Sequence, residues 1–169
     1  MQRFVDLIDR LSHRLGRAVA WVSLLMVLVM VSIVILRYLF QFGSIAMQES
    51  IMYMNALIFA LGAAYTLKEQ GHVRVDILYS RQSPRRRALI DLLGTALFLL
   101  PSMAAIIWLS WDYVGLSWRL REASPESSGL PFVYLLKSAI LVLAALLFVQ
   151  GIAELLRNWQ RWRSEGGAI

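Results

Sequence analysis

The chain has 169 residues, of which 59% are hydrophobic, and it carries a formal net charge of +6 with no cysteine. This apolar fraction is too high for a soluble domain and is concentrated in long runs, so the sequence indicates one membrane domain without a sizeable soluble part. The basic excess therefore concerns orientation in the membrane and not binding of nucleic acid. The lack of cysteine excludes thiol redox chemistry and Cys-ligated metals.

Residues 1–17 are predicted to form an amphipathic helix ahead of the first span. A basic amphipathic helix can lie in the headgroup plane and hold anionic lipid. The alternative is a cytoplasmic extension of the first span that packs on neighbouring segments. The apolar face carries Phe4, Leu7, Ile8, Leu11 and Leu15, and the charged face carries Arg3, Asp6, Arg10 and Arg17.

Four long apolar runs predict an all-α membrane protein with four transmembrane helices. At a rise of about 1.5 Å per residue, each run reaches roughly 25–33 Å, which is enough to cross the hydrocarbon layer with some tilt. We expect them to form one four-helix transmembrane domain over residues 18–157, followed by a cytoplasmic tail at 158–169. The predicted spans are 18–36, 51–67, 92–111 and 132–153.

The connection between the first two spans is short and charged at both ends. Arg37 closes the first span, and Glu49 opens the second after a turn through Gly43 and Ser44. Both charges stand at the same face of the membrane, where an ion pair between them would neutralise two costly groups. The alternative is that each side chain snorkels to the headgroups by itself.

The second span carries one stripe of mostly small residues. On a helix, Glu49, Tyr53, Ala56, Ala60 and Ala64 share one face. Small side chains let another helix approach closely in lipid. We therefore expect a lateral interface with a partner helix, the alternative being that the stripe packs inside the chain's own four helices.

A compact polar segment follows the second span, Gly71-His72-Val73-Arg74-Val75-Asp76. Gly71 suits a helix C-cap, where a positive φ is required. The alternation that follows would tuck the valines against the helices, leaving His72, Arg74 and Asp76 for structural or partner contacts. Metal ligation by His72 with Asp76 is possible, but a helix-capping or interhelical hydrogen bond is favoured.

Ser83 and Pro84 predict a helix start, with serine as N-cap and proline at the first helical position. The third helix therefore begins before the membrane, and Pro101 should bend it. Arg85, Arg86 and Arg87 fall in the first turn and oppose the helix dipole. We expect these arginines to contact phosphate headgroups.

The distribution of basic residues predicts the orientation. Thirteen Lys and Arg residues lie in the N-terminal segment, the second connection and the C-terminal tail. The opposite side has four, namely Arg37, Arg119, Arg121 and Lys137. By the positive-inside rule both termini are expected in the cytoplasm.

The sequence shows little sign of chemistry. Its two histidines, His13 and His72, fall outside the predicted spans, whereas a membrane haem usually needs two facing histidines within them. There is no Ser-His-Asp set, phosphate loop or paired carboxylate in a span, so we expect neither an enzyme nor a cofactor. The spans are almost free of charge, although a transporter acting alone should carry polar groups near the midplane.

Several of these segments together resemble the small membrane subunit of tripartite ATP-independent periplasmic (TRAP) transporters, over residues 18–157. They are Arg37-Tyr38, Gln48-Glu49, Gly62 to Lys68, the Gly71 to Asp76 segment and Gly129-Leu130-Pro131. The details are closest to a branch associated with 2-oxo acids and related organic anions. That branch usually has Gly-Gly-Leu-Pro, whereas Ser128 replaces the first glycine here.

The resemblance implies a non-catalytic scaffold in a bacterial inner membrane. Such subunits pair with a large permease subunit that holds the substrate and sodium sites, and a periplasmic solute-binding protein delivers a carboxylate to it. Two other functions stay open: a stand-alone four-helix exporter that uses Glu49 as its coupling carboxylate, and a membrane anchor for a redox enzyme. The position of Glu49 at a helix end and the lack of a histidine pair in the spans disfavour them.

Overall fold

The computed structural model describes residues 2–69 and 82–164. Within them the chain forms long helices and connecting turns without a strand, which confirms the predicted all-α membrane fold. Four helical segments are long and apolar enough to span a membrane: Val5–Leu39, Ile45–Lys68, Pro84–Leu120 and Val133–Ser164. The elements are α1 (Gln2–Leu39), α2 (Ile45–Lys68), α4 (Pro84–Gly94), a π-helical turn (Thr95–Leu99), α5 (Leu100–Leu120) and α6 (Val133–Ser164).

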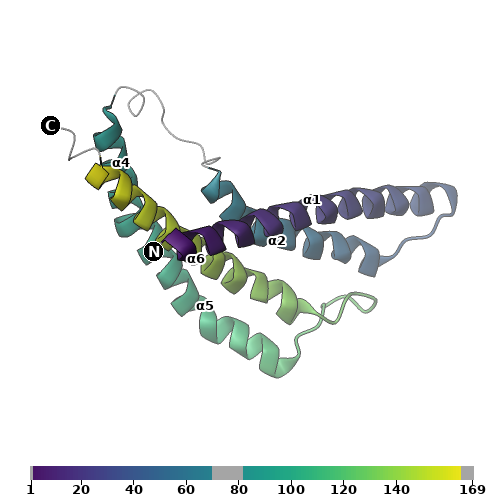
Figure 1. Ribbon diagram of the computed structural model, residues 1–169. Helices are drawn as coiled ribbons and strands as arrows, with labels where there is room; N and C mark the ends of the chain where they lie inside the picture. The colour runs from purple at the N-terminus through teal and green to yellow at the C-terminus, as the bar shows by residue number, and fades with distance from the viewer. Residues whose placement is uncertain (1, 70–81, 165–169) are drawn as a thin grey trace.

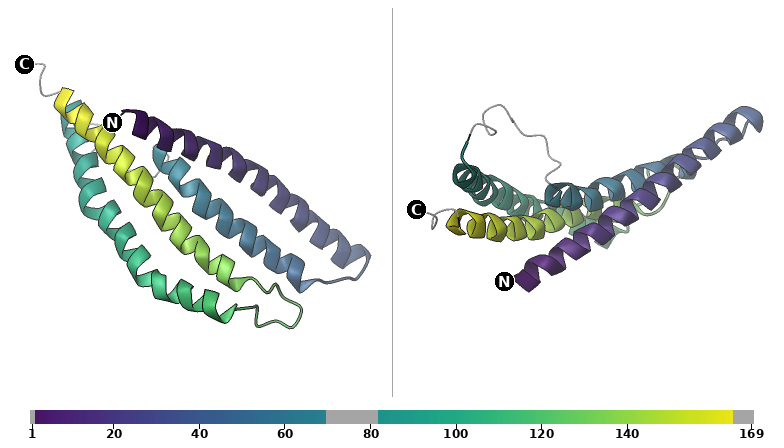
Figure 2. Two further views of the ribbon diagram at one scale, coloured as in Figure 1. Left: turned by 60° about the horizontal axis from the view of Figure 1, so that its bottom comes forward. Right: turned by 45° about the horizontal axis from the view of Figure 1, so that its top comes forward.

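The helices lie side by side in one layer, in the order α1, α2, α6 and then α4 with α5 (Figure 2, left). α2 packs against α1 on one side and α6 on the other, and α6 packs against α4 and α5. Among the described residues, α1 and α2 make no extensive contact with α4 or α5. The N-terminal part of α1, which contains Asp9 and Ser12, also contacts α6, and Figure 1 shows the two helices crossing near the N-terminus.

Small residues form the seams of this layer. Ala60 and Ala64 of α2 are 2% and 1% exposed, and Ala144 and Ala153 of α6 are 1% and 0% exposed. A Cβ atom added at Gly16 would lie 2.7 Å from ring carbons of Tyr65, so the Tyr65 ring of α2 packs directly on the backbone of α1 there. Close packing of this kind is what holds helices together in lipid.

Both faces of the layer are left uncovered by the chain itself. Large apolar side chains point outward along every long helix; Trp21 is 73% exposed, Phe59 66%, Phe98 73% and Trp108 82%. An apolar surface of this extent is incompatible with water, so lipid or another membrane protein must cover it.

The N-terminal residues continue into the first span as a single helix, α1. Within this extension Ile8 and Ser12 are buried, at 6% and 3% exposure, against the neighbouring helices. Leu7 and Leu11 on the outer face are exposed. Of the two alternatives for this segment, the contacts therefore favour an extension packed on its neighbours.

The third span starts and bends where the sequence predicts. Ser83 caps α4 by accepting a hydrogen bond from Arg86 N, and Pro84 is the first helical residue. Pro101 has no N–H and its ring crowds the carbonyl of Leu97. The preceding turn widens into a π-helix in which Leu100 N donates to Thr95 O. The α4–α5 segment curves along α6 as a result (Figure 2, left).

The prediction of a lateral partner interface is wrong for Ala60 and Ala64, because both are already buried within the chain. Ala56 and Ala60 face α6 across an apolar crevice of about 340 Å³ that Leu136 and Ala139 also line. The small-residue stripe therefore serves mainly the seam between α2 and α6.

Replacing Ala64, which is buried and lies outside this crevice, by Leu should destabilise the chain itself. The added bulk forces α2 away from the helix packed on it, and overpacking of this kind typically costs about 1–3 kcal/mol. The measurement is thermal unfolding of the purified chain in detergent, with Ala105→Leu on the exposed surface of α5 as the matched control. Equal unfolding temperatures for the two variants would contradict the observed seam.

Candidate functional site

Polar side chains gather at the two ends of the layer. We call the end with the N-terminal part of α1 and the last turns of α6 the terminal end, and the end with connections 40–44 and 121–132 the loop end. Between these ends the helices are uncharged. No Asp, Glu, Lys or Arg occurs in residues 18–36, 51–67, 92–111 or 138–153.

At the loop end, Glu49 in the first turns of α2 holds the connection between α5 and α6. One carboxylate oxygen accepts a hydrogen bond from the Ser124 hydroxyl, and the other accepts from Leu130 N at 2.6 Å. A Cβ atom at Gly129 would lie 2.3 Å from Ser124 Oγ and 2.8 Å from Glu49 Oε1, so only glycine fits there. The carboxylate thus closes the connection over the end of α2.

The predicted ion pair between Arg37 and Glu49 is wrong. Arg37 is exposed and makes no ion pair with any residue that the structure describes. Both oxygens of Glu49 are instead occupied by Ser124 and Leu130, from a connection 75 or more residues further along the chain. Sequence reasoning missed these two residues, although Gly129-Leu130-Pro131 had signalled a constrained turn.

An ion pair fastens the same connection to α6. Glu122 Oε2 accepts hydrogen bonds from Lys137 Nζ at 2.6 Å and from Ser117 Oγ at 2.6 Å. The bond from Lys137, followed by that from Ser117, lowers the pKa of Glu122 below its ordinary value. The Lys137 ammonium also lies 4.2 Å from the centre of the Tyr113 ring. The loop end is therefore tied to α2, α5 and α6.

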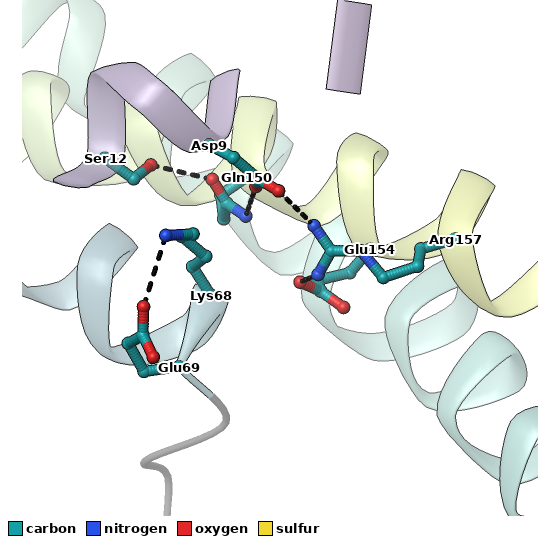
Figure 3. Close-up of polar contacts among 7 residues, drawn as sticks. All are labelled: Asp9, Ser12, Lys68, Glu69, Gln150, Glu154 and Arg157. Atoms are coloured by element: carbon teal, nitrogen blue, oxygen red, sulfur yellow. Dashed lines mark hydrogen bonds and ion pairs between the residues drawn. The ribbon is translucent and has the colours of Figure 1, made fainter. Parts of the chain in front are cut away.

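At the terminal end, a polar network joins α1 to α6 (Figure 3). Arg157 Nη2 lies 2.7 Å from Asp9 Oδ2, and its Nη1 donates to Glu154 on the same helix. Gln150 Oε1 accepts from Ser12 Oγ at 2.8 Å, and Gln150 Nε2 donates to Asp9 Oδ1 at 3.3 Å. One guanidinium thus faces two carboxylates.

Most of this network is buried. Gln150 is 0% exposed, Ser12 3% and Glu154 5%. Burying such groups is costly unless they are hydrogen-bonded or paired, and the network meets that condition. Sequence reasoning missed it, although Gln150 and Glu154 stand one helical turn apart at the end of the fourth span.

The other predicted contact residues are less constrained. Arg85 and Arg86 are exposed, and the Arg85 guanidinium lies 5.6 Å from the centre of the Trp162 ring. Arg87 is half-buried and donates from Nε to Gln82 O at 2.9 Å. Headgroup binding by these three arginines stays a prediction. His72, Arg74 and Asp76 lie outside the described residues.

The geometry of the two polar ends indicates attachment of neighbouring helices. Residues 2–69 and 82–164 contain no group of three His, Cys, Asp or Glu side chains that could hold a metal ion. What the two ends do is fix neighbouring helices to each other. With the order of the helices fixed, the layer presents two wide apolar faces.

A family model described as "Tripartite ATP-independent periplasmic transporters, DctQ component" matches residues 26–161 of the chain. The match begins within the first span and covers the second and third spans, nearly all of the fourth, and both connections of the loop end. No curated protein and no solved structure matches the chain.

Replacing Glu49 by Ala should release the loop end. Leu130 N loses its acceptor, so its amide hydrogen should exchange with solvent roughly tenfold faster. Hydrogen exchange of the purified chain measures this, with Glu126→Ala as control because that side chain is exposed in the same connection. Unchanged exchange at Leu130, or an equal effect of both substitutions, would contradict the role of Glu49.

Proposed function

Because the chain belongs to the DctQ component family of tripartite ATP-independent periplasmic transporters, we propose that it scaffolds the large permease subunit of such a transporter. In this proposal the chain is the non-catalytic small membrane subunit. The large subunit carries out sodium-coupled uptake of a carboxylate that a periplasmic solute-binding protein delivers. This chain reaches the binding protein through the assembled complex.

The observation that supports scaffolding is the open, uncharged layer. A protein that moves a polar substrate across the membrane by itself needs polar groups near the midplane. Here the charged side chains of the described residues lie toward the ends of the layer, where they bind one another or face the surroundings. The broad apolar faces between the ends are suited to extending the membrane-embedded surface of a partner.

The loop-end geometry argues against a stand-alone exporter driven by Glu49. A coupling carboxylate must exchange protons or ions during transport, whereas Glu49 holds Ser124 and Leu130. It also lies in the second turn of α2 and not near the middle of the span. Scaffolding requires neither exchange nor a central carboxylate.

We further propose a multi-pass location in a bacterial inner membrane with both termini cytoplasmic. The thirteen-to-four division of basic residues supports this orientation. Because the chain has no cysteine, Ser127→Cys at the loop end and Gln160→Cys on α6 can each serve as the single label site. In intact inner-membrane vesicles of right-side-out orientation, an impermeant thiol reagent should label position 127 alone. Labelling of position 160 alone would reverse the assignment.

Uptake by cells that express the transporter subunits tests the scaffold function. Cells that express the cognate large subunit and binding protein are compared with and without this chain, using a panel of radiolabelled carboxylates and a sodium gradient. We expect uptake only when the chain is present, together with its co-purification with the large subunit. As a control, the chain with Glu126→Ala should support uptake as the wild type does, because this side chain is exposed and makes none of the contacts described at the two polar ends. Full uptake without the chain would exclude an obligatory scaffold.

A further inference from the structure

We propose that the terminal end holds a binding site for the headgroup of an acidic phospholipid, in a cleft bounded by α1, α2 and α6. The proposal goes beyond the scaffold function and does not depend on it, because it concerns a site on this chain alone. The ligand class is a phosphate diester that carries acyl chains, as in phosphatidylglycerol.

The cleft has two adjoining parts. The first, of about 530 Å³, lies along α1 and reaches Lys68 at the end of α2. The second, of about 410 Å³, continues from Asp9 and Lys68 toward α6. Together they are lined by six basic side chains, Arg10, Arg14, Arg17, Lys68, Arg157 and Arg161, against the three acidic side chains Asp6, Asp9 and Glu69.

Part of this charge is already neutralised inside the protein. Asp9 is bound to Arg157, and Lys68 lies 3.2 Å from Glu69 (Figure 3). The remaining excess is carried mainly by Arg10, Arg14 and Arg17, which are exposed on α1. None of these three forms a hydrogen bond or an ion pair with a residue that the structure describes.

Three guanidinium groups on one side of a cleft suit a phosphate. Arginine presents several N–H donors in a planar fork that matches phosphate oxygens, and such charge-assisted bonds are short and strong. Basic pockets at the cytoplasmic ends of membrane helices bind anionic headgroups for this reason.

The depth of the cleft favours a lipid over a soluble anion. Arg17 directly precedes the first apolar run and Lys68 ends the second helix, so both stand at the level of the headgroups. On the same face of α1 but on the membrane side of Arg17, Trp21 and Leu24 are 73% and 49% exposed and offer an apolar surface. A phosphate in the cleft can therefore bind while its acyl chains follow these side chains into the hydrocarbon layer.

The tryptophans of α6 also indicate that this end of the protein lies at the level of the headgroups. Trp159 and Trp162 lie at the terminal end, where their ring centroids are 5.7 Å apart. Arg163 lies 5.2 Å from the centre of the Trp159 ring. Tryptophan beside arginine is typical of the boundary between hydrocarbon and headgroups.

The test compares lipid selectivity in vesicles of phosphatidylcholine that contain the full chain. Spin-labelled phosphatidylglycerol and spin-labelled phosphatidylcholine are added separately, and the motionally restricted fraction of each is measured by electron paramagnetic resonance. The wild type should prefer phosphatidylglycerol by about fivefold. One basic residue near an anionic membrane surface raises the affinity by about this factor. High salt should reduce the preference.

Variants locate the site. Replacing Arg10, Arg14 and Arg17 together by Gln should remove most of the preference, whereas replacing them by Lys should retain most of it. The matched control replaces three exposed arginines at the loop end, Arg37, Arg119 and Arg121, by Gln and should leave the preference intact.

Three results would overturn the proposal. One is an unchanged preference in the glutamine variant of the cleft, and another is loss of preference in the lysine variant. The third concerns the source of the phosphate. If sodium phosphate displaces the labelled phosphatidylglycerol more effectively than sodium chloride of equal ionic strength, the cleft binds free phosphate and not a lipid. An equal effect of the two salts supports the lipid headgroup.

Discussion

Close packing of the helices at small residues is the interaction on which this structure depends. Lipid is as apolar as the outward-facing side chains, so the hydrophobic effect does not press membrane helices together. Association must come from close packing along narrow seams, which small residues such as Gly16, Ala64 and Ala153 permit. Because each helix meets its neighbours along a narrow strip, the rest of its surface remains open, and the four spans form a layer.

Polar contacts at the two ends fix the order of the helices in that layer. Arg157 and Gln150 hold the N-terminal part of α1 against α6, across the end of α2. At the other end Glu49 closes the α5–α6 connection over α2. Placing the charges at the ends leaves an uncharged middle, which is the property that suits a scaffold for a transporting partner. A central polar site would serve a different function.

Much of the fold follows from the sequence because its causes are local. Hydropathy gives the four spans, Ser83 and Pro84 give a helix start, and Pro101 gives a bend. The partners of Glu49 do not follow, because they come from a connection distant in sequence and one of them is a backbone N–H. A stripe of small residues such as Ala60 and Ala64 indicates that another helix packs closely there. The periodicity does not indicate whether that helix belongs to the same chain or to a partner.

The distance between α1 and α5 tests the layer most directly. Spin labels at Val27→Cys on α1 and Ser102→Cys on α5 occupy exposed positions near the middle of their spans, and Leu57→Cys on α2 gives a neighbouring-helix control with position 27. With about 8–10 Å between adjacent helix axes, the layer predicts that the axes of α1 and α5 lie roughly 24–30 Å apart. Double electron–electron resonance on the full chain in nanodiscs should therefore give a clearly longer 27–102 distance than 27–57 distance. Similar distances for the two pairs would mean that the helices close into a bundle and would contradict the account.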